Sequence, residues 1–157
     1  MSKTVKTREI ERRLWQFTNR KKPVYGVFEV TVGYIAYGAE GYDRADYITL
    51  ETDGTIWAYE IKTTVSDFHS AAKKSFIGDY NYLVLSRDVY EAVKDNGLPW
   101  GIGVVVENET GGLTLVRKSG HKNVSVGQRA EVVESMLKAA TRDNYKWWSQ
   151  PDSLYWK

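Results

Sequence analysis

A predicted β-hairpin constrains the fold of this chain more than any other feature of its sequence. Thr52-Asp53-Gly54 separates two runs of strand-forming residues. Asp-Gly in such a place is a strong hairpin signal. A three-residue loop, with Gly54 in the left-handed conformation, sets Glu51 opposite Thr55, whereas a two-residue loop shifts the pairing by one residue. The register of the hairpin therefore depends on the length of this loop.

The register decides whether three charged side chains share one face of the hairpin. Alternate side chains of a strand project to the same side, so Glu60 and Lys62 project together. The three-residue loop sets Asp46 directly opposite Glu60, and the two-residue loop turns Asp46 to the other face. Two opposed carboxylates are unfavourable without a cation beside them. A site that uses both carboxylates therefore requires the three-residue loop.

Such a pair of carboxylates has the chemistry of a magnesium site. Mg²⁺ prefers hard oxygen ligands and keeps several waters, so one or two carboxylates and substrate phosphate oxygens are enough to bind it. A lysine beside the ion can orient or activate an attacking water, or neutralise charge on the phosphorus. We assign this role to Lys62. The alternative is a solvated face on which Lys62 forms an ion pair with Asp46 and Glu60.

The order Asp46, then Glu60-Ile61-Lys62 on the next strand, resembles the PD-(D/E)XK nuclease superfamily. Within it, the chain is most similar to the MmcB-like branch of DNA-repair nucleases and more loosely similar to archaeal-type Holliday junction resolvases. The similarity covers roughly residues 5–86, and its specific part is 44–68. Ala45 replaces the proline that names the motif, a departure that removes no ligand.

The resemblance implies both a fold and a set of ligands. The fold is a restriction-endonuclease-like α/β core, in which helices flank a central mixed sheet and the elements follow an α-β-β-β-α-β order. Asp46, Glu60 and the backbone carbonyl of Ile61 are implied as ligands of Mg²⁺, with Mn²⁺ as a substitute. Asp46, Glu60 and Lys62 are the implied catalytic residues.

The family often carries one more acid on its first helix, and we choose Glu9 as that catalytic residue. An apolar stripe with the spacing i, i+4, i+7 predicts a helix here, and Glu9 borders the stripe. The stripe consists of Ile10, Leu14 and Phe17. Glu11, on the same helix, and Glu29, on the next strand, are alternatives. Equally, Glu9 is interpreted as an exposed acid that pairs with Arg13 at i+4.

Basic residues are spread unevenly along the chain and suggest contacts with a phosphate backbone. The first cluster contains Lys3, Lys6, Arg8, Arg12, Arg13, Arg20, Lys21 and Lys22, and the second contains Arg117, Lys118, His121 and Lys122. We select Arg12, Arg13 and Lys122 from these clusters as nucleic-acid contacts. The alternative is that these residues form solvated basic faces.

Three further residues are candidate nucleic-acid contacts. The helix after the motif lends a basic or amide side chain to the active site in many members of the superfamily, which implicates Lys73 or Lys74. Arg44 lies just before the Asp46 strand. Its alternative role is an ion pair with Asp46 or Glu60.

Length and composition set outer bounds on the class of protein. The 157 residues suit a single domain, 1–157, with a sizeable core. The chain has no cysteine, and its N-terminus lacks the apolar run of a signal peptide, so we expect a cytoplasmic location. No apolar stretch is long enough to span a bilayer, and we expect no membrane partner. A net charge of +2 is too small to prove an anionic partner by itself.

Hydrophobic patterns and turn signals predict the remaining elements. They are a helix capped by Ser66 and ended by Gly78, a central strand over 80–85, a helix over 88–94, strands over 100–107 and 113–118, and a closing helix over 128–141. In the closing helix we expect Val133, Leu137 and Ala140 to face inward.

The C-terminal tail is rich in aromatic residues. These are Tyr145, Trp147, Trp148, Tyr155 and Trp156. Few charges lie between them, so we interpret the tail as a terminus docked against the sheet or as the self-association surface of a homodimer. A stacking platform for single-stranded nucleic acid is the less favoured interpretation.

Together these patterns predict a Mg²⁺-dependent nuclease that hydrolyses phosphodiester bonds in repair, recombination or related DNA processing. We expect nucleic acid as the partner and favour DNA over RNA. One alternative is a non-catalytic nucleic-acid-binding module on the same fold. The other is an RNA-directed nuclease, because none of these residues is specific for or against the 2′-hydroxyl.

Overall fold

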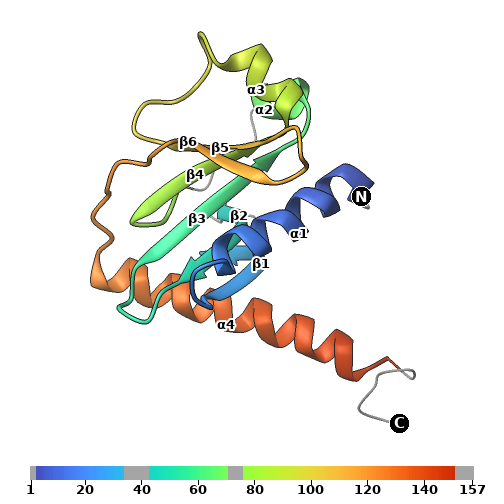
Figure 1. Cartoon of the computed structure of the whole chain (residues 1–157). Helices are drawn as coiled ribbons and strands as arrows, with labels where there is room; N and C mark the ends of the chain where they lie inside the picture. Colours follow the sequence, from blue (N-terminus) through green and yellow to red (C-terminus); the bar gives the residue numbers. More distant parts are fainter. Residues whose placement is uncertain (1–2, 34–42, 71–75, 151–157) are drawn as a thin grey trace.

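The computed structural model describes residues 3–33, 43–70 and 76–150. The elements, in chain order, are α1 (Val5–Asn19), β1 (Tyr25–Val32), β2 (Asp43–Leu50), β3 (Ile56–Lys62), α2 (Val65–His69), β4 (Tyr80–Leu85), α3 (Arg87–Val93), β5 (Gly103–Glu107), β6 (Leu113–Arg117) and α4 (Val126–Trp148) (Figure 1). The first six follow the predicted α-β-β-β-α-β order.

The six strands form one mixed sheet in the order β1-β2-β3-β4-β5-β6. β1, β2 and β3 are antiparallel neighbours, β4 runs parallel to β3 and β5, and β6 is antiparallel to β5. Helices flank this sheet, so the predicted α/β class is confirmed. β4 is the predicted central strand and is buried from Asn81 to Leu85, as expected of a strand covered on both faces.

The β2–β3 hairpin has the three-residue loop. The backbone N–H of Glu51 donates to the carbonyl of Thr55 at 2.9 Å. Gly54 has a φ of 89°, a left-handed conformation that favours glycine. In the same register Tyr47 pairs with Tyr59. This is the register that the three-residue loop predicts, and the ladder ends at this pair, one residue before Asp46 would face Glu60.

Helix α1 covers one face of the sheet, at the centre of Figure 1. Its buried residues Ile10 and Leu14 pack on Tyr47, Tyr59 and Tyr82. Tyr59 alternates with Glu60 along β3, so α1 covers the face opposite to Glu60 and Lys62.

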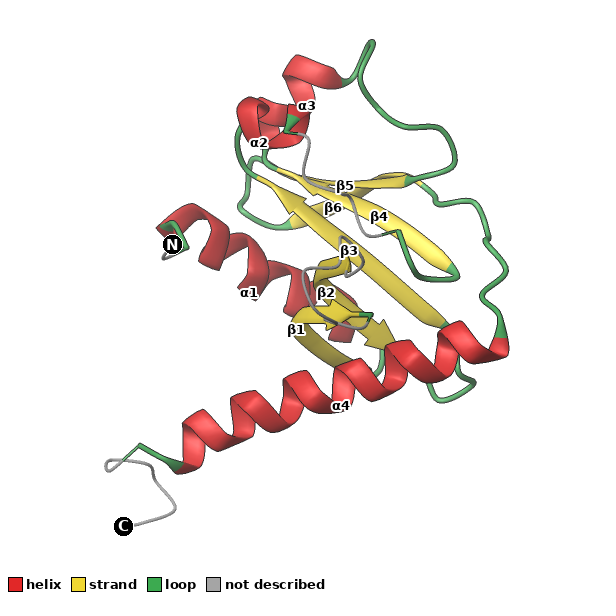
Figure 2. Cartoon of the chain, turned by 180° about the vertical axis from the view of Figure 1, so that it is seen from behind, coloured by secondary structure: helices red, strands yellow, loops and turns green. Residues whose placement is uncertain are grey.

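The other face is shared by two groups of helices. α4 packs its residues Val132, Met136 and Ala139 on the β1–β3 half, and Figure 2 shows it crossing beside β1 and β2. α2 and α3 cover the β4–β5 half. Phe68 of α2 packs there against Leu83 and Leu85. Glu60 and Lys62 pair in register with those two leucines. They therefore project between the two groups of helices.

Two helix predictions are wrong in detail. Val133, Leu137 and Ala140 do not face inward, because the buried stripe of α4 lies one residue earlier along the helix. The helix after the motif is capped by Thr64, whose hydroxyl accepts from the Asp67 N–H, and not by Ser66. It ends at His69, since Ser70 adopts an extended conformation.

The last turns of α4 carry Tyr145, Trp147 and Trp148, which are 73%, 43% and 44% exposed. This end of α4 projects past the sheet in both views (Figures 1 and 2), so the prediction that it docks against the sheet is wrong for these three residues. Tyr155 and Trp156 lie outside the described residues. Among the helices of the described ranges, none combines the length and apolarity that a membrane crossing requires.

Candidate active site

The strands β2 and β3 separate at the point where the predicted acids lie. Their ladder ends at Tyr47 and Tyr59. In a continued ladder, the N–H of Ile61 would donate to the carbonyl of Ala45. Instead it donates to Oδ2 of Asp46 at 2.7 Å. The Asp46 carboxylate is therefore inserted between the two strands and fixed by the backbone of β3.

Glu60 and Lys62 are buried beside this carboxylate. They are 5% and 6% exposed, although buried charges are costly unless they are paired. Nζ of Lys62 lies 3.5 Å from Oδ1 of Asp67, a half-exposed residue in the first turn of α2. The Lys62 ammonium also interacts electrostatically with Asp46. Two acids and one lysine thus share a site that is largely shielded from water.

The environment of Asp46 disfavours its charge. Burial raises the pKa of Asp46 above its ordinary value, although the Ile61 N–H, the Lys62 ammonium and the Glu60 side chain act in the opposite direction. A raised pKa means that the cations nearby do not fully offset the desolvation of the carboxylate. A bound cation at this position would favour the ionised form.

Glu29 extends the row of acids into the next strand. β1 pairs with β2 on both sides of it, through Phe28–Tyr47 and Val30–Ala45, which places Glu29 level with Asp46. Among the described residues other than glycine, Glu29 has the positive φ, at 53°. Such strain is concentrated at functional sites. The local break in the ladder turns the Glu29 carboxylate towards two cations.

Those cations are Lys3 and Arg44. Oε1 of Glu29 lies 3.1 Å from Nζ of Lys3 and 2.7 Å from Nη2 of Arg44. Lys3 also pairs with Glu11 of α1. Its charge is one of those that act on the pKa of Asp46. The edge of the site is therefore lined by a network of alternating charges.

The structure does not bring every candidate acid to this site. Glu9 is exposed on α1, whereas Glu11 is half-buried and reaches the edge of the site through Lys3. The sequence pattern placed both acids on the first helix without deciding between them. Asp67 and Lys3 were missed as neighbours of the site, whereas Glu29 was named as an alternative acid and lies beside it. For Glu29 a signal exists, because a polar residue interrupts the apolar alternation of β1.

The predicted nucleic-acid contacts fall into separate groups. Arg44 lies at the site and pairs with Glu29, a partner that the sequence did not indicate. Arg12 is exposed on α1. Arg13 forms an ion pair with Glu107 of β5, which connects α1 to the sheet. Lys73 and Lys74 lie outside the described residues.

Lys122 lies far from the acids. Its Nζ donates to the carbonyl of Phe76 at 2.9 Å, and its backbone N–H donates to the carbonyl of Asp79 at 2.8 Å. Asp79 contacts Ile56, the first residue of β3, and Lys62 is the last. At about 3.3 Å per residue, the two ends of β3 are roughly 20 Å apart. A contact of Lys122 with nucleic acid would therefore lie away from Asp46.

The donor set fits a magnesium ion with few protein ligands. In the described part of the chain, no group of three or more His, Cys, Asp and Glu side chains is arranged to hold a metal ion. The site offers two carboxylates, Asp46 and Glu60, and the Ile61 carbonyl. Mg²⁺ commonly takes one or two carboxylates and completes its shell with water and substrate phosphate. The buried Glu60 and the partly buried Asp46, whose charge is disfavoured by burial, suit such an ion.

Comparisons with known proteins support the fold and do not indicate a function. No family model matches the chain, and no curated protein matches it significantly. Among solved structures, the chain is similar to SPO1766, a protein of unknown function from Silicibacter pomeroyi. The two share 20% sequence identity with a TM-score of 0.57, over 76% of this chain and 75% of that chain. This likeness supports the α/β fold alone.

Proposed function

We propose that this chain is a metal-dependent nuclease of the PD-(D/E)XK type. The observation that carries the proposal is the insertion of the Asp46 carboxylate between β2 and β3, next to the buried Glu60 and Lys62. A surface ion pair needs neither the separation of two strands nor the burial of Glu60 and Lys62. The arrangement does suit a site that holds a cation and a phosphate.

The residues divide the chemistry among them. Asp46, Glu60 and the Ile61 carbonyl would hold Mg²⁺ or Mn²⁺, which supplies Lewis acidity to the scissile phosphate and lowers the pKa of a bound water. Lys62 donates hydrogen bonds to that water or to the phosphate and orients the water for in-line attack. Asp67 positions the Lys62 ammonium from α2. The backbone of Ile61 positions Asp46.

Burial of Lys62 makes these roles more effective. A charge in a site with little water interacts more strongly with a developing negative charge than the same charge at the surface. The 6% exposure of Lys62 also fixes its direction, because the surrounding side chains leave it few rotamers. Arg44 and Lys3, paired with Glu29 and Glu11, place a guanidinium and an ammonium at the edge of the site, where the flanking backbone of the substrate would pass.

We propose DNA as the substrate because the motif is most similar to the MmcB-like DNA-repair nucleases. The test is cleavage of single-stranded, duplex and branched DNA, and of matched RNA, with Mg²⁺, Mn²⁺ or EDTA. The Lys62→Met protein controls for contaminating nucleases, and Lys94→Met is a matched substitution at an exposed lysine.

The proposal predicts metal-dependent cutting that is lost in Lys62→Met and retained in Lys94→Met. Equal cutting by all three proteins would contradict the site. Binding that persists in EDTA, with no cleavage of any substrate, would favour a non-catalytic nucleic-acid-binding module. Cutting of RNA but not of matched DNA would favour the RNA-directed nuclease.

A further inference from the structure

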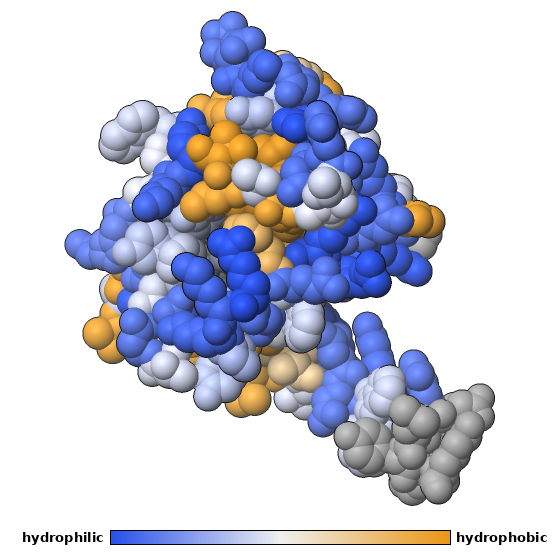
Figure 3. Space-filling view, viewed as in Figure 1, coloured by the Kyte–Doolittle hydropathy of each residue, from blue (hydrophilic) through white to orange (hydrophobic). Residues whose placement is uncertain are grey.

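A second site lies on the face of the sheet that α1 covers, opposite to Asp46, Glu60 and Lys62. There the C-terminal end of α1 and strand β6 border a cavity of about 370 Å³. Its floor is aromatic, with Trp57 and Tyr59 from β3 and Tyr80 and Tyr82 from β4. Figure 3 shows apolar side chains gathered in a hollow between the β5–β6 pair and α1, with hydrophilic side chains along its border. We call this site the aromatic groove.

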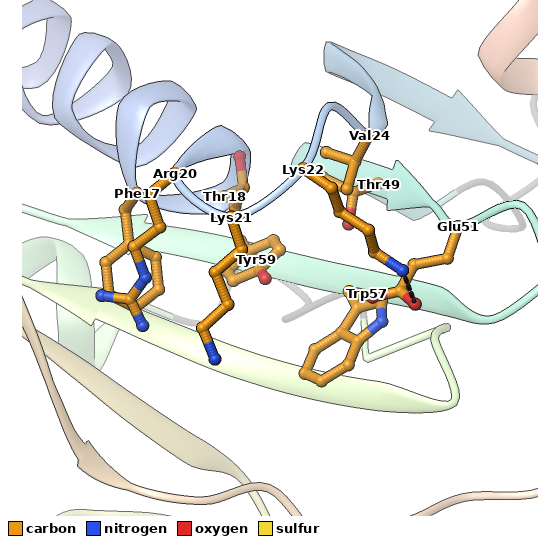
Figure 4. Close-up of a pocket in the computed structure, with 10 residues that line it drawn as sticks. All are labelled: Phe17, Thr18, Arg20, Lys21, Lys22, Val24, Thr49, Glu51, Trp57 and Tyr59. Atoms are coloured by element: carbon orange, nitrogen blue, oxygen red, sulfur yellow. Dashed lines mark hydrogen bonds and ion pairs between the residues drawn. The ribbon is translucent and has the colours of Figure 1, made fainter.

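The aromatic groove continues towards the loop after α1. An adjoining hollow of about 230 Å³ shares Phe17, Arg20, Trp57 and Tyr59 with the first cavity (Figure 4). Arg20 lines both volumes, Lys21 and Lys22 line the smaller one, and Lys118 lines the larger one. Together they form an elongated groove, which suits a chain-like ligand better than a compact one.

The floor is built as a stack of rings. Trp57 and Tyr80 stack with their ring centroids 4.5 Å apart, and Tyr59 and Tyr82 stack at 5.6 Å. Trp57 and Tyr80 are only partly buried, so the stack reaches the cavity. The indole N–H of Trp57 is shielded from solvent, yet it has no hydrogen-bond acceptor in the described part of the chain. A planar ligand in the groove would extend the stack of rings.

The border of the groove is cationic. Arg20, Lys21 and Lys22 follow α1, and Lys118 follows β6, and all four are exposed. Figure 4 shows the Lys21 side chain beside Tyr59 and the Lys22 side chain beside Trp57. Glu51 is the one acid among its lining residues and pairs with Lys22 at 3.4 Å. The groove therefore offers a net positive border above an aromatic floor.

We propose that the aromatic groove binds single-stranded nucleic acid, with unpaired bases against the ring stack and phosphates on Arg20, Lys21, Lys22 and Lys118. Aromatic stacking combined with a positively charged groove is the general mode of sequence-tolerant binding to single strands. An acidic peptide would satisfy the cations but has no use for stacked rings, and a duplex buries its bases. The proposal does not depend on cleavage at Asp46, because the groove lies on the other face of the sheet.

The experiment measures binding by fluorescence anisotropy in EDTA, so that cleavage does not interfere. The probes are a labelled oligothymidine strand, an abasic strand of the same length and a duplex. Arg20→Ala/Lys21→Ala removes two cations from the border, and Lys94→Ala/Lys138→Ala is the matched control at exposed lysines elsewhere. Tyr80→Leu keeps an apolar side chain while it removes a ring. Thermal unfolding checks that each variant is folded.

We expect the groove variant Arg20→Ala/Lys21→Ala to weaken oligothymidine binding about tenfold and the control pair to change it less than about twofold. For this variant, the slope of log K against log salt concentration should become less negative by about 1.4, because two phosphate contacts are lost. Tyr80→Leu should weaken binding of oligothymidine about tenfold without changing that of the abasic strand.

Three results would overturn the proposal. The first is equal binding by the groove variant and the control variant. The second is equal affinity for the abasic strand and oligothymidine, which would exclude stacking. The third is displacement of the strand by an oligoglutamate peptide at equal concentration, which would make the groove a site for acidic protein segments. A chain that cleaves nothing but passes these tests would lose the proposed nuclease function and keep this binding site.

Discussion

An aspartate from a neighbouring segment accepts a backbone N–H near each end of β3. The two aspartates differ in how far nearby cations compensate their charge. At the first end, Asp79 accepts from Ile56 at 2.8 Å and receives two further bonds from Arg129, at 2.9 and 3.0 Å. At the other end, Asp46 accepts from Ile61 at 2.7 Å but lies beside a second acid, Glu60.

The pKa values of the two acids move in opposite directions. The Arg129 guanidinium holds the pKa of Asp79 below its usual value, whereas burial raises the pKa of Asp46. Asp79 has the partners that a structural acid requires, because its negative charge is fully compensated within the fold. Asp46 has too little positive charge around it, as expected of a residue that is completed by a ligand. The comparison separates an acid whose charge the fold compensates from the acid that we propose as a metal ligand.

Loss of the Lys62 ammonium should have the largest effect of any change at either end of β3. Lys62→Met keeps most of the buried stem, removes the charge and should lower the cleavage rate about 10³-fold, because a charged donor to the reacting phosphate is lost. Single-turnover cleavage of the preferred substrate measures this effect. A rate within a few fold of the wild-type rate, with Lys94→Met as the matched control, would remove Lys62 from the mechanism.

Asp79→Asn should destabilise the fold by about 2 to 3 kcal/mol, because it weakens two charge-assisted bonds to Arg129. The cleavage rate per folded molecule should not change. Urea denaturation and active-site titration measure the two quantities separately. A normal free energy of unfolding together with lost cleavage would reverse the comparison and make Asp79 the functional acid.

The contribution of Asp79 should depend on pH. Its pKa is lowered in the folded state, so its stabilisation is present above the unfolded value of about 3.9 and is lost as the pH falls through the folded value. The difference in unfolding free energy between wild type and Asp79→Asn should therefore shrink as the pH falls below about pH 4. A difference that grows over that same range would contradict this assignment.

Asp46→Asn should sharpen the contrast, because it makes the same chemical change at the other acid. Without metal it should cost little stability or slightly raise the melting temperature, since it removes a disfavoured buried charge and keeps an acceptor for Ile61. Mg²⁺ at ten times its dissociation constant should stabilise the wild type by about 1.4 kcal/mol and the variant far less. Thermal unfolding with and without Mg²⁺ measures both effects. Equal stabilisation of the two proteins would place the ion elsewhere.

Gly54→Ala should have the smallest effect and tests the turn that sets the register. The left-handed backbone at Gly54 costs a non-glycine residue about 1 kcal/mol, and no atom lies within 4 Å of the added methyl group. We expect a loss of stability of that size with cleavage unchanged. A large loss of cleavage without loss of stability would show that the turn does more than hold the register.

The sequence predicts those features of the site that depend on the alternation of side chains along a strand and on the residues of the turn. Asp53-Gly54 and the alternation of β3 are local signals, so they correctly predict the three-residue loop and its register, which bring Asp46 near Glu60 and Lys62. The separation of β2 from β3 is not local. It depends on which group accepts from the Ile61 N–H, and a sequence pattern does not distinguish the Asp46 carboxylate from the Ala45 carbonyl.

The sequence also does not determine which face of helix α4 is buried. In α4 the stripe Val132, Met136 and Ala139 and the stripe Val133, Leu137 and Ala140 have the same helical spacing. The first packs on Val30, Ile48 and Ile56, and only the shape of that sheet surface decides between them. On α1 the predicted stripe is buried at Ile10 and Leu14, but Glu9 and Glu11 both border it, and the pairing of Glu11 with Lys3 is not a local signal.

Metal binding at Asp46 and Glu60 is the central claim, and diffraction from crystals soaked in Mn²⁺ tests it most directly. Anomalous scattering locates Mn²⁺ without any assumption about activity. We predict a peak within ligand distance of the carboxylates of Asp46 and Glu60 and of the Ile61 carbonyl, and its absence in crystals of Asp46→Asn. A peak only at other acids, or none at a Mn²⁺ concentration that supports cleavage, would contradict the site.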